Sequence, residues 1–119
     1  MSMDNFIPLL KDVPDEEGCR LIGFRTFERI PAGRFEASIQ ASRTHYCTPR
    51  SVLPPDAYSD FEVAIFEGDE WVLPRSDERF RDKPWAALFE DSEINSVAGY
   101  VPRETVQQIL NDLEAVREP

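Results

Sequence analysis

Cysteine and histidine are scarce in this sequence of 119 residues, which contains Cys19, Cys47 and a single histidine, His45. Two cysteines cannot build a disulfide framework, and we expect both to be reduced. His45 and Cys47 lie two residues apart and could both reach a zinc ion. Zinc normally needs three or four protein ligands, however, and nothing in the sequence marks the others. The sequence therefore predicts a fold without a metal or another cofactor.

A long apolar run is also missing. No stretch approaches the roughly 20 apolar residues of a membrane span. Met1–Leu10 has no basic run ahead of an apolar stretch, and Asp4 and Pro8 interrupt it, which is untypical of a signal peptide. We expect no membrane association and a cytoplasmic location. Glycine-rich phosphate loops, serine-centred elbows and helical zinc motifs are absent as well, so no motif marks an enzyme class.

Positive charge is in short supply: 13 lysines and arginines stand against 23 aspartates and glutamates, and the formal net charge is −10. An acidic surface repels nucleic acid, so we expect no direct nucleic-acid binding. Residues 20–50 depart from this balance, because they carry six arginines and two glutamates. Acidic neighbours could neutralise these arginines within the fold, or the arginines could form a patch that recognises carboxylate or phosphate groups.

The first half of the chain reads as strands. Residues 20–30 and 35–41 are predicted to be strands joined by a turn at Pro31–Gly33. A hairpin is predicted over 58–73, with the two-residue loop Gly68-Asp69 placing Phe66 opposite Trp71. The strand over 35–41 has the period-two alternation of a half-buried strand, with one face formed by Phe35, Ala37, Ile39 and Ala41.

The second half is mixed. We expect a loop or a single helical turn over 76–83, a short helix from Pro84, an acidic loop over 90–96 and a strand over 97–101. A helix is predicted from Pro102 to about Val116, with an apolar stripe of Val106, Ile109, Leu110 and Leu113.

Together these elements predict one α+β domain over residues 1–119, in which residues 1–19 are a loosely structured lead-in. The expected architecture is an antiparallel sheet of four to five strands with the C-terminal helix packed on one face. The length is that of a common single domain.

Residues 42–50, Ser-Arg-Thr-His-Tyr-Cys-Thr-Pro-Arg, form the densest cluster of chemically capable side chains. A straight continuation of the preceding strand would place Arg43, His45 and Cys47 on the core side, where an arginine and a histidine need partners. We therefore expect either a bulge that changes the register or a strand that leaves the core. The candidate binding residues of this segment are Arg43, His45, Tyr46 and Arg50.

Two other interpretations of this cluster stay open. It could be structural, with Tyr46 packed and His45 hydrogen-bonded. It could also be catalytic, because Cys47 beside His45 is the pairing that a small hydrolase or transferase needs, and a nearby arginine would lower the pKa of the thiol.

The stretch Ala37–Ser42, continuing into His45–Arg50, resembles small uncharacterised proteins of phage and prophage genomes, and the resemblance returns at Gly99–Pro102 and the helix after it. It covers about a quarter of the chain; the Trp71 hairpin and the ending at Arg103–Pro119 fit less well. The resemblance implies a small accessory protein of a mobile element or its bacterial host, with no activity attached.

The sequence thus favours an acidic accessory protein that binds a protein partner through residues 43–50 or through its acidic surface. In one variant, the carboxylates imitate the charge of DNA at a site on a host protein. The alternative is the Cys47 and His45 enzyme.

Overall fold

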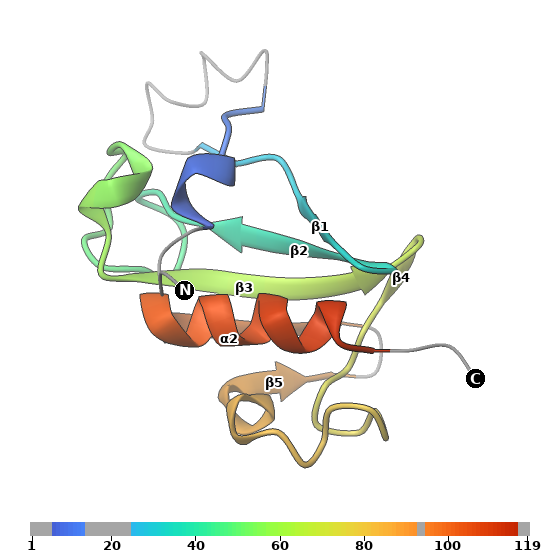
Figure 1. The fold of residues 1–119 in the computed structure, drawn as a ribbon. Helices are drawn as coiled ribbons and strands as arrows, with labels where there is room; N and C mark the ends of the chain where they lie inside the picture. The colour runs from blue at the N-terminus through green and yellow to red at the C-terminus, as the bar shows by residue number, and fades with distance from the viewer. Residues whose placement is uncertain (1–5, 14–24, 93–94, 117–119) are drawn as a thin grey trace.

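The computed structural model describes residues 6–13, 25–92 and 95–116. Its strands form one antiparallel sheet in the order β1-β2-β3-β6-β5, and β4 pairs with the end of β3 (Figure 1). The predicted α+β class, with a C-terminal helix on an antiparallel sheet, is confirmed. The strands are β1 (Ile30–Ala32), β2 (Phe35–Gln40), β3 (Asp60–Glu67), β4 (Glu70–Trp71), β5 (Phe89–Asp91) and β6 (Ser96–Pro102).

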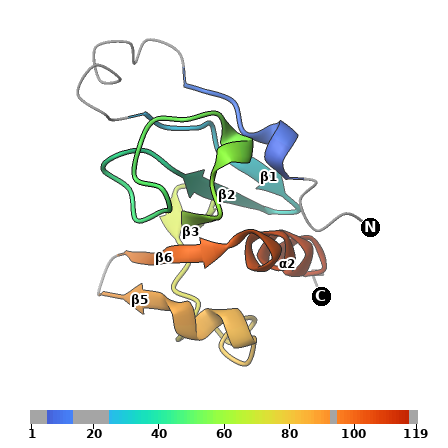
Figure 2. The same cartoon turned by 90° about the vertical axis from the view of Figure 1, so that its left-hand side faces the viewer.

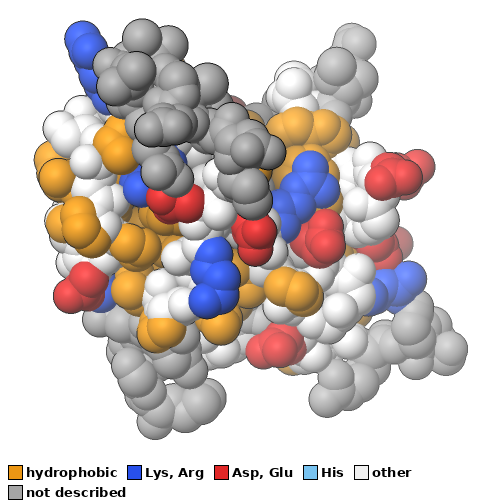
Figure 3. All heavy atoms as spheres, turned by 90° about the horizontal axis from the view of Figure 1, so that it is seen from above, with side chains coloured by type: hydrophobic (Ala, Val, Ile, Leu, Met, Phe, Trp, Pro, Cys, Tyr) orange, Lys and Arg blue, Asp and Glu red, His pale blue; other side chains and the backbone are white. Residues whose placement is uncertain are grey.

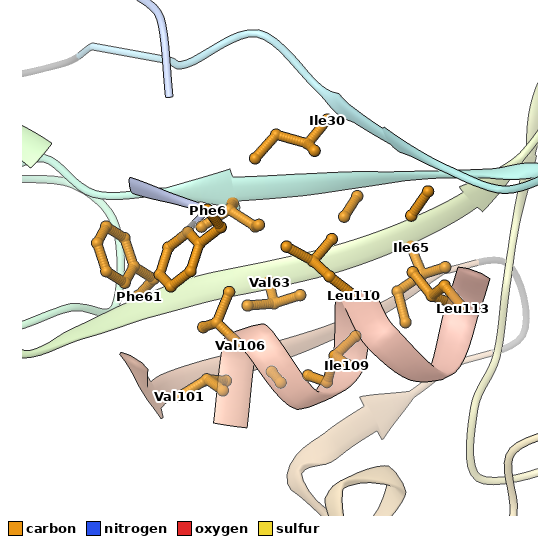
Figure 4. Packing of buried hydrophobic residues seen from close by; sticks show 14 of the residues in the cluster. Phe6, Ile30, Phe61, Val63, Ile65, Val101, Val106, Ile109, Leu110 and Leu113 are labelled. Atoms are coloured by element: carbon orange, nitrogen blue, oxygen red, sulfur yellow. The ribbon is translucent and has the colours of Figure 1, made fainter. Parts of the chain in front are cut away.

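The helix α2 (Arg103–Glu114) covers one face of the sheet (Figures 1 and 2). It contacts β1, β2, β3 and β6. Pro102 ends β6 and caps the helix, one residue from the predicted start. The predicted stripe is confirmed, because Val106, Ile109, Leu110 and Leu113 are buried against the sheet (Figure 4). None of the helices in the described part of the chain is long and apolar enough to cross a bilayer.

The alternation predicted for β2 is confirmed, since the side chains of Phe35, Ala37 and Ile39 are buried on the α2 side. The hairpin of β3 and β4 is confirmed too. It turns at Gly68, which has φ 63°, and Phe66 pairs with Trp71 at 4.5 Å between ring centroids. The cross-strand aromatic pair fixes this register.

The strand predicted over 20–30 is only partly found, and residues 20–24 lie outside the described ranges. β1 begins at Ile30 and includes Pro31 and Ala32, which we expected in the turn. Ahead of it, the backbone of Phe27 bonds to the side chain of Gln40: Phe27 N donates to Oε1 at 2.7 Å and Gln40 Nε2 donates to Phe27 O at 3.0 Å. The Gln40 side-chain amide thus takes the place of a backbone partner for Phe27. This contact buries Gln40 although its side chain points away from α2.

Two further segments differ from the prediction. Glu90 belongs to β5, which pairs with β6, where an acidic loop was expected. Phe6 and Leu10, from the segment expected to be a lead-in, join the core around the 3-10 helix η1 (Ile7–Leu9), and Phe6 packs edge-on against Phe61 (Figure 4). The other 3-10 helices are η2 (Pro55–Ala57) and η3 (Pro84–Leu88), the latter starting at Pro84 as predicted.

Several arginines of residues 20–50 have acidic partners. Arg29 lies 3.5 Å from Glu36, and Arg34 lies 2.7 Å from Glu67. Arg79 also binds Glu67, at 3.0 Å, and joins it to Asp77 at 2.7 Å. In the view of Figure 3, basic and acidic side chains are interspersed. Neutralisation within the fold therefore accounts for part of the arginine excess.

Candidate functional site

The predicted cluster begins where β2 ends. After Gln40 the chain turns, and the Ser42 hydroxyl accepts a hydrogen bond from Thr44 N at 3.3 Å and lies 2.7 Å from His45 Nδ1. Neither expected arrangement is found as such, because β2 ends at Gln40 and the segment after the turn keeps Cys47 in the core. The turn separates the cluster into exposed and buried members.

The exposed members are Arg43, Tyr46 and Arg50. Arg50 Nε donates to Arg43 O at 3.2 Å, and the Arg50 guanidinium lies 5.4 Å from the centre of the Tyr46 ring. Within the described ranges, neither of these arginines forms an ion pair, so their charges remain available to a partner. His45, in contrast, is only 9% exposed, although it lines a depression together with Glu62 and Trp71.

Cys47 is buried too, as is Ser42. The Cys47 side chain is 1% exposed, and its Sγ donates to Ser42 O at 3.3 Å and to Pro49 O at 3.4 Å. Desolvation raises the pKa of the thiol above its ordinary value of 9.0. Cys19 lies outside the described residues. Across the ranges that are described, no three His, Cys, Asp or Glu side chains are placed to hold a metal ion.

The segment that carries these residues is anchored from behind by Arg25 and Tyr58. The Arg25 guanidinium, 3% exposed, donates to Ala41 O at 2.6 Å, to Leu53 O at 3.1 Å and to Tyr58 Oη at 2.8 Å. Tyr58 Oη also accepts from Leu53 N at 2.7 Å and donates to Ser51 O. Both ends of the segment are therefore tied to one buried node.

A β-bulge receives the segment on the sheet. Phe61 pairs with Val101 and Val63 pairs with Ala98, so Gly99 and Tyr100 together oppose Glu62. Tyr100 has φ 53°, a left-handed conformation that is uncommon for a residue with a large side chain. Such backbone outliers and bulges concentrate next to functional sites.

Tyr46 is hydrogen-bonded to this bulge and packs against it. Its backbone N donates to Glu62 Oε2 at 3.2 Å, and its carbonyl accepts from Tyr100 N at 2.9 Å. A Cβ added to Gly99 would lie 2.8 Å from Tyr46 Cβ, so the absence of a side chain at Gly99 makes this approach possible. The Tyr46 and Tyr100 rings stack at 5.8 Å between centroids, yet they remain 52% and 49% exposed.

We call the side of the sheet opposite α2 the outer face. Two adjoining depressions lie on it and share Val97 in their lining. The larger, about 680 Å³, is lined by Tyr46, Leu88 and Tyr100. The smaller, about 200 Å³, is lined by Phe66 and Trp71 together with polar side chains that include Gln40, His45 and Glu62. Of the five large hydrophobic side chains exposed in the described part of the chain, four line these two depressions. They form one surface, which we call the aromatic surface: Tyr46, Trp71, Leu88 and Tyr100.

Sequence reasoning found Tyr46 but missed Tyr100, Trp71 and Leu88 as surface residues. Regular alternation would put Val97, Gly99 and Val101 on the same face, and only the bulge turns Val101 inward and Tyr100 outward. No sequence pattern marks that bulge, although a glycine inside a predicted strand is a weak signal for one.

Comparison of the chain with models of protein families, with curated proteins and with solved structures finds no match, so the resemblance to small phage and prophage proteins stays an expectation.

Proposed function

We propose that this chain is a non-catalytic cytoplasmic accessory protein that binds another protein through the aromatic surface. The observation that carries the proposal is the gathering of four exposed large hydrophobic side chains on one face of the sheet. Scattered exposed hydrophobic residues are normal on a protein surface, whereas a contiguous group marks an interaction site.

The composition of this surface supports a protein partner. Tyrosine, tryptophan and arginine dominate the binding energy of protein interfaces. Tyr46 stacks on Tyr100 and lies beside Arg50, which makes no ion pair with any described residue. Each tyrosine offers a large contact area at a low cost in side-chain entropy. The resemblance to phage and prophage proteins adds that the partner belongs to the mobile element or to its bacterial host.

The catalytic alternative receives less support from the geometry. A cysteine nucleophile reacts as the thiolate and must reach its substrate. The Cys47 thiol is buried, donates its proton to backbone carbonyls and has a raised pKa. Each of these three features disfavours nucleophilic attack, so we do not propose an enzyme.

Capture from a lysate of the source organism, followed by mass spectrometry, tests the proposal. The first variant, Tyr46→Ala, and the second, Leu88→Ala, each remove an exposed side chain of the aromatic surface; both should fold normally and lose the captured partner. Leu9→Ala is the matched control, since Leu9 is the exposed large hydrophobic residue that lies off the aromatic surface. If both variants capture the same partner as the unmodified chain and the Leu9 variant, the aromatic surface is not the binding site.

A further inference from the structure

We infer that the larger depression binds a cationic side chain, an arginine or a lysine, carried on an otherwise apolar segment of the partner protein. The inference rests on the proposed function and names the chemistry of the partner. It starts from the groove of about 680 Å³ whose lining combines tyrosine rings with carboxylates.

β6 forms the floor of this groove, with Val97 and Gly99 in it. β5 borders one side, and the segment that carries Tyr46 borders the other. Glu90 pairs with Val97 across the two strands, which places both side chains on the outer face. The groove therefore has an aromatic wall, an apolar floor and a carboxylate opposite the rings.

Glu90 is the carboxylate that a ligand can use. It is exposed, and within the described ranges it makes no ion pair. The neighbouring Asp91 is already engaged, because one oxygen accepts from the Ser96 hydroxyl and the other from Ser76 Oγ at 3.3 Å. Glu62 lines the smaller depression next to the groove, and its Oε2 accepts a hydrogen bond from Tyr46 N at 3.2 Å.

Charge and ring chemistry together select a cation. The Tyr46 ring already has the Arg50 guanidinium 5.4 Å from its centre, so the Tyr100 ring is the one that can attract an ammonium or a guanidinium group of a ligand. The Glu90 carboxylate adds a charge-assisted hydrogen bond. The net charge of −10 raises the local concentration of cationic partners around the whole molecule. Leu88 and Val97 complement the apolar residues on either side of that cation.

The backbone conformation of Tyr100 also supports a role for its ring in ligand binding. Glycine or asparagine adopts a left-handed conformation more readily than tyrosine does. The bulge itself therefore does not require a tyrosine, and the ring adds a stacking surface at the edge of the groove.

Titration of the labelled chain with the capped tripeptide Ac-Leu-Arg-Leu-NH2, followed by NMR, tests the inference. Ac-Leu-Gln-Leu-NH2 and Ac-Leu-Glu-Leu-NH2 are the uncharged and anionic controls. We expect saturable shifts at the amides of Val97 and Tyr100 with the arginine peptide, and weaker binding of the other two. Glu90→Gln should weaken the arginine peptide about two- to five-fold, the usual size of one partly exposed cation–π or ion-pair contact. Glu78→Gln, which removes an exposed glutamate outside the groove, should leave it unchanged.

Three results would overturn the inference: equal affinity for the three peptides, tighter binding of the glutamate peptide, or no shifts in the groove. The second result would assign Arg43 and Arg50 as an anion site. These failures differ from a failure of the proposed function. If lysate capture needs Tyr46 and Leu88 but is unchanged by Glu90→Gln, the aromatic surface binds a protein without a cation in the groove.

Discussion

Gly99→Ala is the substitution that tests the geometry of the aromatic surface most directly. The three atoms closest to an added Cβ all belong to Tyr46: Cβ at 2.8 Å, Cδ2 at 3.3 Å and Cγ at 3.4 Å. The closest one is next to the backbone and cannot rotate away, so the segment itself has to move. Overpacking of this kind costs about 1–3 kcal/mol, and alanine in place of a strand glycine returns about 0.5–1 kcal/mol. We expect a net loss of about 1–2 kcal/mol, which lowers the Tm by roughly 4–8 °C in a domain of this size.

A double-mutant cycle isolates the contact, because Tyr46→Gly removes all three atoms. In that background Gly99→Ala should stabilise the fold by about 0.5–1 kcal/mol, so the coupling energy is about 1.5–3 kcal/mol. Urea unfolding of the four proteins, followed by circular dichroism, measures it. If Gly99→Ala costs the same with and without the tyrosine, Tyr46 does not pack on the bulge, and the aromatic surface is built differently.

Three further predictions concern the core and the charged groups. Leu110→Ala should destabilise the fold by about 2–5 kcal/mol in urea unfolding, and a loss below about 0.5 kcal/mol would mean that the α2 stripe is not packed. Cys47 should be alkylated by iodoacetamide slowly at pH 7.5 and rapidly after denaturation; fast alkylation of the native chain, located by peptide mapping, would revive the catalytic alternative. Hydrogen bonds with Arg79 lower the pKa of Glu67 and Asp77 below their ordinary values of 4.5 and 3.8. The folded state therefore binds protons less readily than the unfolded state. The resulting stabilisation is complete above these values and is lost as the pH falls through the lowered pKa. Arg79→Met should reduce the loss of stability between pH 6 and pH 3, and an unchanged loss would contradict the assignment.

The sequence indicates most of the elements on which the site is built. Alternation located β2, the Gly68 turn fixed the hairpin register, and the period of the apolar stripe located α2, because each pattern reports a local geometry. β5 escaped prediction because Phe89–Asp91 is short and acidic, and its pairing with β6 is what makes it a strand. The same holds for Gln40, whose burial depends on a backbone segment 13 residues away.

The candidate site could be predicted only in part. The segment 42–50 stands out by composition, but composition cannot tell that Arg43, Tyr46 and Arg50 are exposed while His45 and Cys47 are buried. That division follows from a turn held by the Ser42 hydroxyl. The contribution of Tyr100 depends on a bulge, and the contribution of Leu88 depends on where η3 places it, so both require the three-dimensional arrangement.

The buried node of Arg25 and Tyr58 has a consequence for how recognition could change. It sets the path of residues 41–58 through backbone carbonyls and a backbone amide, and it uses none of the exposed side chains. A loop whose shape is fixed by main-chain contacts tolerates exchange of its outward residues, much as an antibody framework carries different loops. Arg43, Tyr46 and Arg50 could therefore be replaced to select new partners, by natural variation or in a display library, while the scaffold beneath keeps its form.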